Sequence, residues 1–522
     1  MAFFVSLLVY LLIIITLLAV RATQRPFSMS WTVAGLGALV FLASVVIWKL
    51  QLPFETTLPD WWNHSLVSVP YSVMIGDNQW ILALGLASFL VAVIFTAPIR
   101  SDLLQIPASL IATYGVVGLS FAGIFAANTA TLFVVWALLD LVEVVNLIRI
   151  SSTKEDTQEA IRNFAFHLFA IGVGIAAVTI WGVNNPATKI SDLNGNTYLI
   201  LLFASAIRLG IFPLRISLRS EPKGQAGFST SIRVSTAIAS IAFTARVMAA
   251  DANSQWTSIF LVFILLSGMA AAFAWSATKS GVGQQQYLII AVGAMVIFNA
   301  ATNNPLGAVA WALSLATAGG AFFLFTGKNR QLSAMMGIIP FFMVGVPFTA
   351  TSTVYLSTTP LPWLLFPMYA ITHVSTVVGF YRHLFALPTD DLKDQPVWAQ
   401  TVYPAGLLIG PAILLLAGFW GWQGGATIGL WWASILILAI ILALGAIAWK
   451  LKEAFFDFLR IKADPLTEAI SMFAAIFRSI SEPLNSMATS LILTTTAVFE
   501  GEGGMLWIGL FIVLIILAAR MM

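Results

Sequence analysis

Ionisable side chains occur in segments that are otherwise apolar enough to cross a membrane. Residues 204–219 read ASAIRLGIFPLRISLR, with Arg208 and Arg215 on either side of Pro213. An arginine at the centre of an isolated transmembrane helix costs about 2.5 to 3.5 kcal/mol on insertion scales, so it usually faces protein or water and has a partner. Pro213 removes a backbone hydrogen bond and frees a carbonyl. We therefore expect a broken helix with a cation on each side of the break, as in the lining of a hydrated path.

The candidate partners of Arg208 are two carboxylates in an apolar segment at 128–148. Asp140 and Glu143 are three residues apart, so they lie about 60° apart around a helix and project into the same sector. Two carboxylates in an apolar bundle repel each other, and at least one takes up a proton unless a cation neutralises it. We expect the Arg208 guanidinium within about 4 Å of one of them. In the alternative interpretation, these charges pair only to hold helices in register.

Two further groups complete the candidate proton or ion path. His167 lies in the apolar segment 163–182, and Arg233 lies in the next segment but one, at 226–250. A structural role in the core is the alternative for His167. The path candidates are therefore Asp140, Glu143, His167, Arg208, Arg215 and Arg233.

The composition excludes several classes of function. Hydrophobic residues make up 59% of the 522 residues and charged residues 9%, which indicates an integral membrane protein. There is no cysteine, so thiolate-bound clusters and disulfides are excluded, and the four histidines are too scattered for a haem or metal centre. No phosphate-binding glycine loop or nucleophile–base arrangement stands out. We expect no cofactor, metal or nucleic acid and no catalytic site in this chain, so any redox or ATP chemistry belongs to a partner.

The apolar runs predict an all-α polytopic membrane protein with sixteen transmembrane helices. The predicted spans are 2–20, 30–50, 79–98, 107–125, 128–148, 163–182, 197–217, 226–250, 256–276, 286–302, 307–326, 332–352, 362–382, 402–421, 428–450 and 504–521.

The sequence also predicts how the chain is oriented. Most lysines and arginines outside the spans follow odd-numbered spans, which places those loops in the cytoplasm and both termini outside. We expect a bacterial or archaeal inner (cell) membrane. The long loop at 51–78 should cap the extracytoplasmic face, and the span at 2–20 should be retained because no cleavage site follows it.

The C-terminal region differs from the rest. Apolar residues recur at spacings of four and three from Leu466 to Leu491, which predicts an amphipathic helix over about 465–495 with a kink at Pro483. We expect this lateral helix to lie along the cytoplasmic face and strap neighbouring helices together; the alternative is a helix floating in lipid headgroups. The predicted organisation is a bundle at 1–450, a lateral helix segment at 451–503 and an anchor at 504–522.

Several segments resemble the antiporter-like membrane subunits of respiratory complex I, membrane-bound hydrogenases and multisubunit cation/proton antiporters. The segment VMIGDNQW is similar to the family's sequence after its first long loop, and ANTATLFVVWALLDLVEVVNLI to its helix in which Trp is followed by Glu. IRLGIFPLRISL resembles its broken helix. Weaker similarities are FTARVM, ATAGGAFFLFTG, MVGVPFTATS and GFYRHLFALP. The predicted lateral helix and last span resemble the long members of the family.

The resemblance implies buried proton-carrying lysines, and this chain departs from that pattern. The family lysine falls on Arg208 and the family glutamate on Ala137, with Asp140 and Glu143 as possible substitutes. Other lysine positions fall on Ile238 and Gly319. A guanidinium does not release its proton near neutral pH, so Arg208 can act as a fixed counter-ion or gate only.

Two functional hypotheses follow from the resemblance. In the first, the chain is a subunit of a complex I-type or related energy-converting complex, for example a proton-translocating quinone oxidoreductase. It then either has a remodelled proton or cation path through the segments at 128–250 or is a degenerate structural copy. In the second, it belongs to a multisubunit cation/proton antiporter or an inorganic-carbon uptake system. Either implies other antiporter-like and small membrane subunits as partners, with a proton or monovalent cation as the transported ion.

Overall fold

A computed structural model describes most of the chain. The described residues are 2–23, 27–57, 72–99, 107–151, 153–181, 189–212, 214, 226–246, 255–277, 285–325, 327–328, 330–355, 365–386, 390–391, 396–419, 422, 431–451, 486 and 490. Pro213, Arg215, most of the expected lateral helix with Pro483, and the expected last span at 504–521 lie outside these residues.

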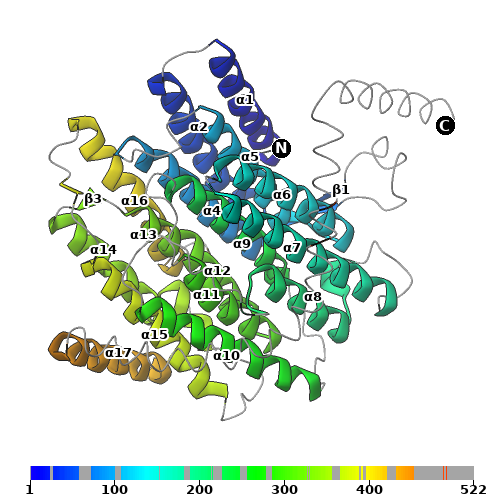
Figure 1. The fold of residues 1–522 in the computed structure, drawn as a ribbon, viewed down its shortest axis with the longest axis vertical. Coiled ribbons are helices and arrows are strands. Elements are labelled where there is room, and N and C mark those ends of the chain that lie inside the picture. Colours follow the sequence, from blue (N-terminus) through cyan, green and yellow to red (C-terminus); the bar gives the residue numbers. More distant parts are fainter. Residues whose placement is uncertain are drawn as a thin grey trace.

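The fold is a bundle of apolar helices (Figure 1). A hydrocarbon environment offers no partners to free backbone groups, so helices that satisfy their own hydrogen bonds are favoured. The α-helices are α1 (Ala2–Ala22), α2 (Phe27–Trp48), α4 (Asp77–Thr96), α5 (Pro107–Phe125), α6 (Thr129–Ile150), α7 (Lys154–Trp181), α8 (Gly195–Arg208), α9 (Ala226–Ile241), α10 (Gln255–Ala277), α11 (Gln285–Ala301), α12 (Pro305–Ser314), α13 (Gly320–Leu324), α14 (Arg330–Phe342), α15 (Leu365–Ala386), α16 (Val397–Phe419) and α17 (Trp431–Leu451).

The predicted fold class, an all-α polytopic membrane protein, is confirmed. Among the described residues, nine helices are long and apolar enough to cross a membrane, and three shorter apolar helices accompany them. The total of sixteen spans stays a prediction.

The short elements lie between or beyond the helices. Four 3₁₀ turns, η1 (Lys49–Gln51), η2 (Ala97–Ile99), η4 (Ile190–Asp192) and η5 (Ala242–Arg246), follow or precede α-helices. Strands β1 (Phe54–Thr57) and β2 (Ser72–Ile75) pair antiparallel within the region expected to cap one face, and β3 (Gly327–Lys328) pairs with β4 (Asp390–Asp391). Because β2 leads directly into α4, this pairing fixes where α4 begins.

Helix α4 lies at the centre of the bundle. In its most apolar stretch 94% of residues are buried, compared with 28% for the corresponding stretch of α1. In Figure 1, α1 and α2 lie at one edge and α17 at the opposite edge. Helix α4 packs against α2, α5 and α16, so it joins the N-terminal helices to the C-terminal ones.

Helix α8 ends at Arg208, as expected for a broken span over 197–217. The Gly210 N–H donates to Ile207 O and the Ile211 N–H donates to Ala206 O, while Gly210 has a φ of 74°. This is the glycine-containing Schellman arrangement that terminates helices. The break therefore begins before Pro213, to which the sequence analysis attributed it.

The expected continuous span at 332–352 is wrong. Helix α14 ends at Phe342, turns follow, and the 3₁₀ turn η7 (Ala350–Tyr355) comes next. Gly345 and Phe348 have positive φ values of 86° and 66°, which no α-helix accommodates. The span at 307–326 is continuous in direction but contains the π-helical turn η6 (Leu315–Gly319) between α12 and α13.

Candidate buried ion-pair site

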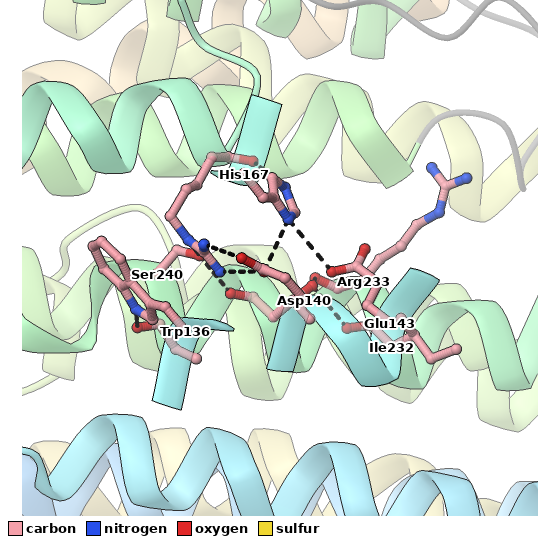
Figure 2. A network of polar contacts seen from close by, with 10 residues as sticks. Trp136, Asp140, Glu143, His167, Ile232, Arg233 and Ser240 are labelled. Carbon is pink, nitrogen blue, oxygen red and sulfur yellow. Dashed lines mark hydrogen bonds and ion pairs between the residues drawn. The ribbon is translucent and has the colours of Figure 1, made fainter. Parts of the chain in front are cut away.

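Three helices bring four of the sequence-predicted ionisable groups into one cluster (Figure 2). Helix α6 supplies Asp140 and Glu143 one turn apart, α7 supplies His167, and α8 supplies Arg208 as its last residue. Arg233 comes from α9, and in Figure 2 its side chain extends away from the cluster on the side of Glu143. Arg215 lies outside the described residues, so its place in the path stays a prediction.

Asp140 and Arg208 form a bidentate ion pair. Arg208 Nη1 donates to Asp140 Oδ2 and Nη2 donates to Oδ1, both at 2.6 Å, and both side chains are 0% exposed. Paired parallel N–H···O bonds are the strongest geometry for a guanidinium and a carboxylate. The contact expected from the sequence between these two segments is therefore present, and Asp140 is the carboxylate that makes it.

Two uncharged side chains complete the surroundings of the guanidinium. Arg208 Nε donates to Ser240 Oγ on α9 at 3.0 Å, and the Trp136 ring on α6 lies 4.5 Å from Arg208 Cζ. Trp136 is itself held by a hydrogen bond from its Nε1 to Ala239 O. These contacts give the third guanidinium nitrogen a partner and cover one face of the guanidinium. The sequence analysis did not identify Ser240 or Trp136 as site residues, although Trp136 lies one helical turn before Asp140.

His167 lies between two hydrogen-bond acceptors. Its Nδ1 is 3.0 Å from Asp140 Oδ1, and its Nε2 is 3.1 Å from Arg208 O. The Arg208 carbonyl is available because α8 ends there. Since both acceptors lack hydrogen, a neutral imidazole, which has one N–H, satisfies only one of them, and an imidazolium satisfies both.

Glu143 is the incompletely satisfied member of the cluster. Its Oε2 is buried and accepts no hydrogen bond from any residue that the structure describes. Glu143 Oε2 lies 3.8 Å from His167 Nδ1. This distance is too long for a hydrogen bond and short enough for one to form after a small movement.

Asp140, Glu143 and His167 also meet the distance requirement for a metal site, because their ligand atoms lie within 4.8 Å of one another. Their hydrogen bonds argue against that use. Both Asp140 oxygens already bind the guanidinium, both His167 nitrogens have acceptors, and a second cation would repel Arg208. The donor set fits a guanidinium and an exchangeable proton better than a metal ion.

The C-terminal helices hold a second buried histidine, with different chemistry. His373 on α15 is 0% exposed; its Nε2 lies 2.7 Å from Met343 O and its Nδ1 lies 2.6 Å from the Tyr355 hydroxyl. A neutral imidazole satisfies this arrangement, because Nε2 donates to the carbonyl and Nδ1 accepts from Tyr355. His373 therefore needs no charge to be satisfied.

Two positions where the resemblance implies lysine lie in buried surroundings. Ile238 is 0% exposed in the core. A Cβ at Gly319, in η6, would lie 3.3 Å from Leu315 Cδ1 and 3.4 Å from Leu288 Cδ2. Apolar side chains surround these two places, whereas the buried carboxylates Asp140 and Glu143 lie on α6.

A helical membrane bundle with a broken helix and a buried ion-pair cluster defines the structural class of this chain. No protein-family model matches the sequence, and no curated protein sequence matches it. Solved structures do match. A chain of the Mrp complex from Dietzia sp. DQ12-45-1b matches with a TM-score of 0.70 and 12% identity over 100% of this chain and 63% of that chain. This chain therefore spans less than two thirds of the Mrp chain's length.

Chains of two other membrane complexes match over nearly their whole length. A chain of respiratory complex I from Thermus thermophilus matches with a TM-score of 0.59 and 14% identity, over 81% of this chain and 100% of that chain. A chain of the membrane-bound sulfane sulfur reductase, an archaeal respiratory membrane complex, matches with a TM-score of 0.55 and 14% identity, over 94% of this chain and 98% of that chain. At these identities the comparisons establish a shared fold.

Proposed function

We propose that this chain is an antiporter-like membrane subunit of an energy-converting complex and that the Asp140–Arg208 cluster is the centre of a remodelled proton path. The observation that carries the proposal is the position of this cluster. A bidentate ion pair, a histidine and an unsatisfied glutamate lie at the break of α8, where a backbone carbonyl is free to bind the histidine. Buried ionisable groups in membrane helices are most often part of ion or proton pathways.

The roles follow from the chemistry of each group. Arg208 keeps its proton and supplies a fixed positive charge that holds Asp140 ionised. His167 and Glu143 are groups that can gain and lose a proton; His167 contacts Asp140 of the fixed pair, and Glu143 lies 3.8 Å from His167. Because Arg208 cannot carry a proton, transfer passes beside it. The partners we propose are other antiporter-like and small membrane subunits, in a bacterial or archaeal cell membrane with both termini outside.

A second candidate is a subunit of a multisubunit cation/proton antiporter or an inorganic-carbon uptake system. The observation that favours it is the match to the Mrp chain, which covers 100% of this chain at a TM-score of 0.70. The apolar surroundings of Gly319 weigh against an antiporter that works alone, because a second charged half-path is missing from the described C-terminal helices at that position.

The conservative variant Arg208→Lys tests whether the cluster conducts protons or only holds helices together. Lysine keeps the charge, loses the bidentate geometry and can release its proton when desolvated. We expect assembled complexes carrying Arg208→Lys to show altered proton transfer. The measurement is proton movement into proteoliposomes that contain the complex purified through a tag on this chain. Equal transfer per assembled complex in variant and wild type would assign the cluster a structural role and overturn the proposed path.

The matched control is Lys154→Arg. Lys154 is an exposed residue at the start of α7, several turns before His167. The exchange replaces one cationic side chain with another and does not touch the cluster. We expect wild-type transfer from this control. Driving the assay first by the complex's redox substrate and then by an imposed sodium gradient separates the two candidate functions.

A further inference from the structure

The cluster divides into a hydrogen-bonded half, Asp140 with Arg208, and a half in which Glu143 Oε2 has no hydrogen-bond partner among the described residues. Asp140 is held by two 2.6 Å bonds from Arg208 and one 3.0 Å contact from His167, and Arg208 is held in addition by Ser240. Glu143 Oε2, by contrast, has no hydrogen-bond partner among the described residues. Figure 2 shows His167 with lines to both Asp140 and Glu143, so this one side chain faces both halves.

The two ring nitrogens of His167 have different freedom. Nε2 lies on the Arg208 carbonyl, which the end of α8 fixes in place. Nδ1 lies 3.0 Å from Asp140 Oδ1 and 3.8 Å from Glu143 Oε2, so a small rotation of the ring or of the glutamate side chain changes its partner. Nδ1 is therefore the nitrogen that can exchange a proton with Glu143 while Nε2 keeps its own.

We infer that His167 and Glu143 share one exchangeable proton, whereas the Asp140–Arg208 pair remains ionised throughout. In the transfer, the Nδ1–H bond of the imidazolium breaks and an O–H bond forms at Glu143 Oε2. The products are a neutral imidazole with its proton on Nε2 and a neutral carboxylic acid. This inference rests on the proposed function for its role in transport.

The charge balance makes this transfer feasible inside the bundle. Before it, the cations Arg208 and His167 balance the anions Asp140 and Glu143. After it, Arg208 balances Asp140 alone, so the net charge of the cluster does not change. Moving a proton between two adjacent groups in this way avoids leaving an unpaired charge in a medium of low dielectric constant.

The other charged groups around Glu143 are few. Those that act on it are Asp140 on its own helix, His167 on α7, Arg208 on α8 and Arg233 on α9. Helix α5, which also packs against α6, has no charged residue between Pro107 and Phe125. Arg233 lies on the side of Glu143 away from Trp136 and Ser240 in Figure 2.

Nuclear magnetic resonance tests the histidine half on the full-length chain in lipid nanodiscs. The sequence has four histidines, so ¹⁵N-histidine labelling gives four rings, and the ring lost in His167→Gln is assigned to His167. We expect Nε2 of His167 to stay protonated as the pH is varied and Nδ1 to change. A change at Nε2 instead, or a ring with one unvarying proton at every pH, would overturn the inference.

Infrared spectroscopy tests the glutamate half on the same samples. We expect a carbonyl band of a protonated carboxylic acid in the wild-type protein and loss of that band in Glu143→Gln, which conserves shape. The control Glu159→Gln removes a partly exposed carboxylate on α7 and should keep the band. Survival of the band in Glu143→Gln would show that another group holds the proton and that the pair is wrongly assigned.

The spectra and the transport assay test separate claims, so one claim can be overturned while the other stands. Spectra as expected together with Arg208→Lys complexes that transfer protons normally would overturn the proposed path and leave the shared proton in place. Contrary spectra together with altered transfer in Arg208→Lys would overturn the shared proton and leave the proposed path. In complexes that pass both tests, Glu143→Gln should lower proton transfer at least tenfold, whereas Glu159→Gln should not.

Discussion

At the scale of single residues, the arginine in the membrane is accounted for by its contacts. Each of the three guanidinium nitrogens of Arg208 has a partner, because Asp140 accepts from Nη1 and Nη2 and Ser240 accepts from Nε. The Trp136 ring covers a face. A buried charge is tolerated when it is paired in this way, and removing one partner leaves the other charge in a medium that does not solvate it.

The single variant Arg208→Leu should therefore be less stable than the double variant Arg208→Leu with Asp140→Leu. Breaking a buried pair on one side typically costs about 3 to 5 kcal/mol, whereas replacing both partners with apolar residues is often close to neutral. We expect the single variant to lower the free energy of unfolding of the full chain by about that amount and the double variant to recover much of it. Thermal unfolding in detergent and the yield of folded protein measure the difference.

The same cycle has a clear contrary outcome. If both variants are equally stable, removing Asp140 recovers nothing once Arg208 is gone, and the penalty expected from an uncompensated Asp140 charge is absent. Adding Glu143→Leu to the double variant should change stability little, because Glu143 Oε2 makes no hydrogen bond with described residues that would be lost.

Part of this site was predictable from residue types alone. The cost of an arginine in lipid required a partner for Arg208, and the three-residue spacing of Asp140 and Glu143 put both in reach. Which carboxylate pairs depends on the rotation of α6 against α8, which the spacing does not determine. Ser240 was missed because α9 carries many hydroxyl residues, and only the packed structure shows which one faces the guanidinium.

At the scale of the elements, the end of α8 positions the site. The Schellman turn at Gly210 releases the Arg208 carbonyl to His167, so the helix end and the histidine are linked by one hydrogen bond. Sequence analysis predicted a break but attributed it to Pro213, because proline is the stronger breaker by type. The span at 332–352 was predicted as continuous because its residues are apolar, although Gly345 and Phe348 bend the chain.

Gly210→Ala tests the importance of that turn. A residue with a side chain in the left-handed region costs about 1 to 2 kcal/mol, so we expect a loss of stability of that size. The control is Gly172→Ala on α7, where an added Cβ meets no atom within 4 Å. That substitution should raise stability by about 0.5 to 1 kcal/mol, because alanine is the better helix former. Equal effects from the two substitutions would indicate that the turn at Gly210 tolerates a side chain.

At the scale of the whole molecule, the two ends of the bundle differ in chemistry. The described ion pair lies on α6 and α8, whereas the described C-terminal helices carry the hydrogen-bonded His373, a buried Arg382 that donates to Ser276 O, and apolar residues around Gly319. The apolar runs of the sequence were sufficient to predict a helical membrane bundle. They could not predict the π-helical turn η6 or the break after α14, because helix continuity depends on backbone angles that hydropathy does not report.

Deleting residues 453–522 tests whether the C-terminal segment holds this chain to its partner subunits. The core from α1 to α17 ends at Leu451, and its buried residues pack against one another, so the deletion removes no described core helix. We expect the truncated chain to keep its thermal unfolding midpoint and the ¹⁵N signals of His167, and to lose co-purification of partner subunits. A parallel variant with charged residues at Phe473 and Ile480 should give the same loss if their stripe contacts a partner, since burying a charge there is unfavourable. If the truncated chain instead unfolds, residues 453–522 stabilise the bundle itself, and the assignment of this segment to assembly is wrong.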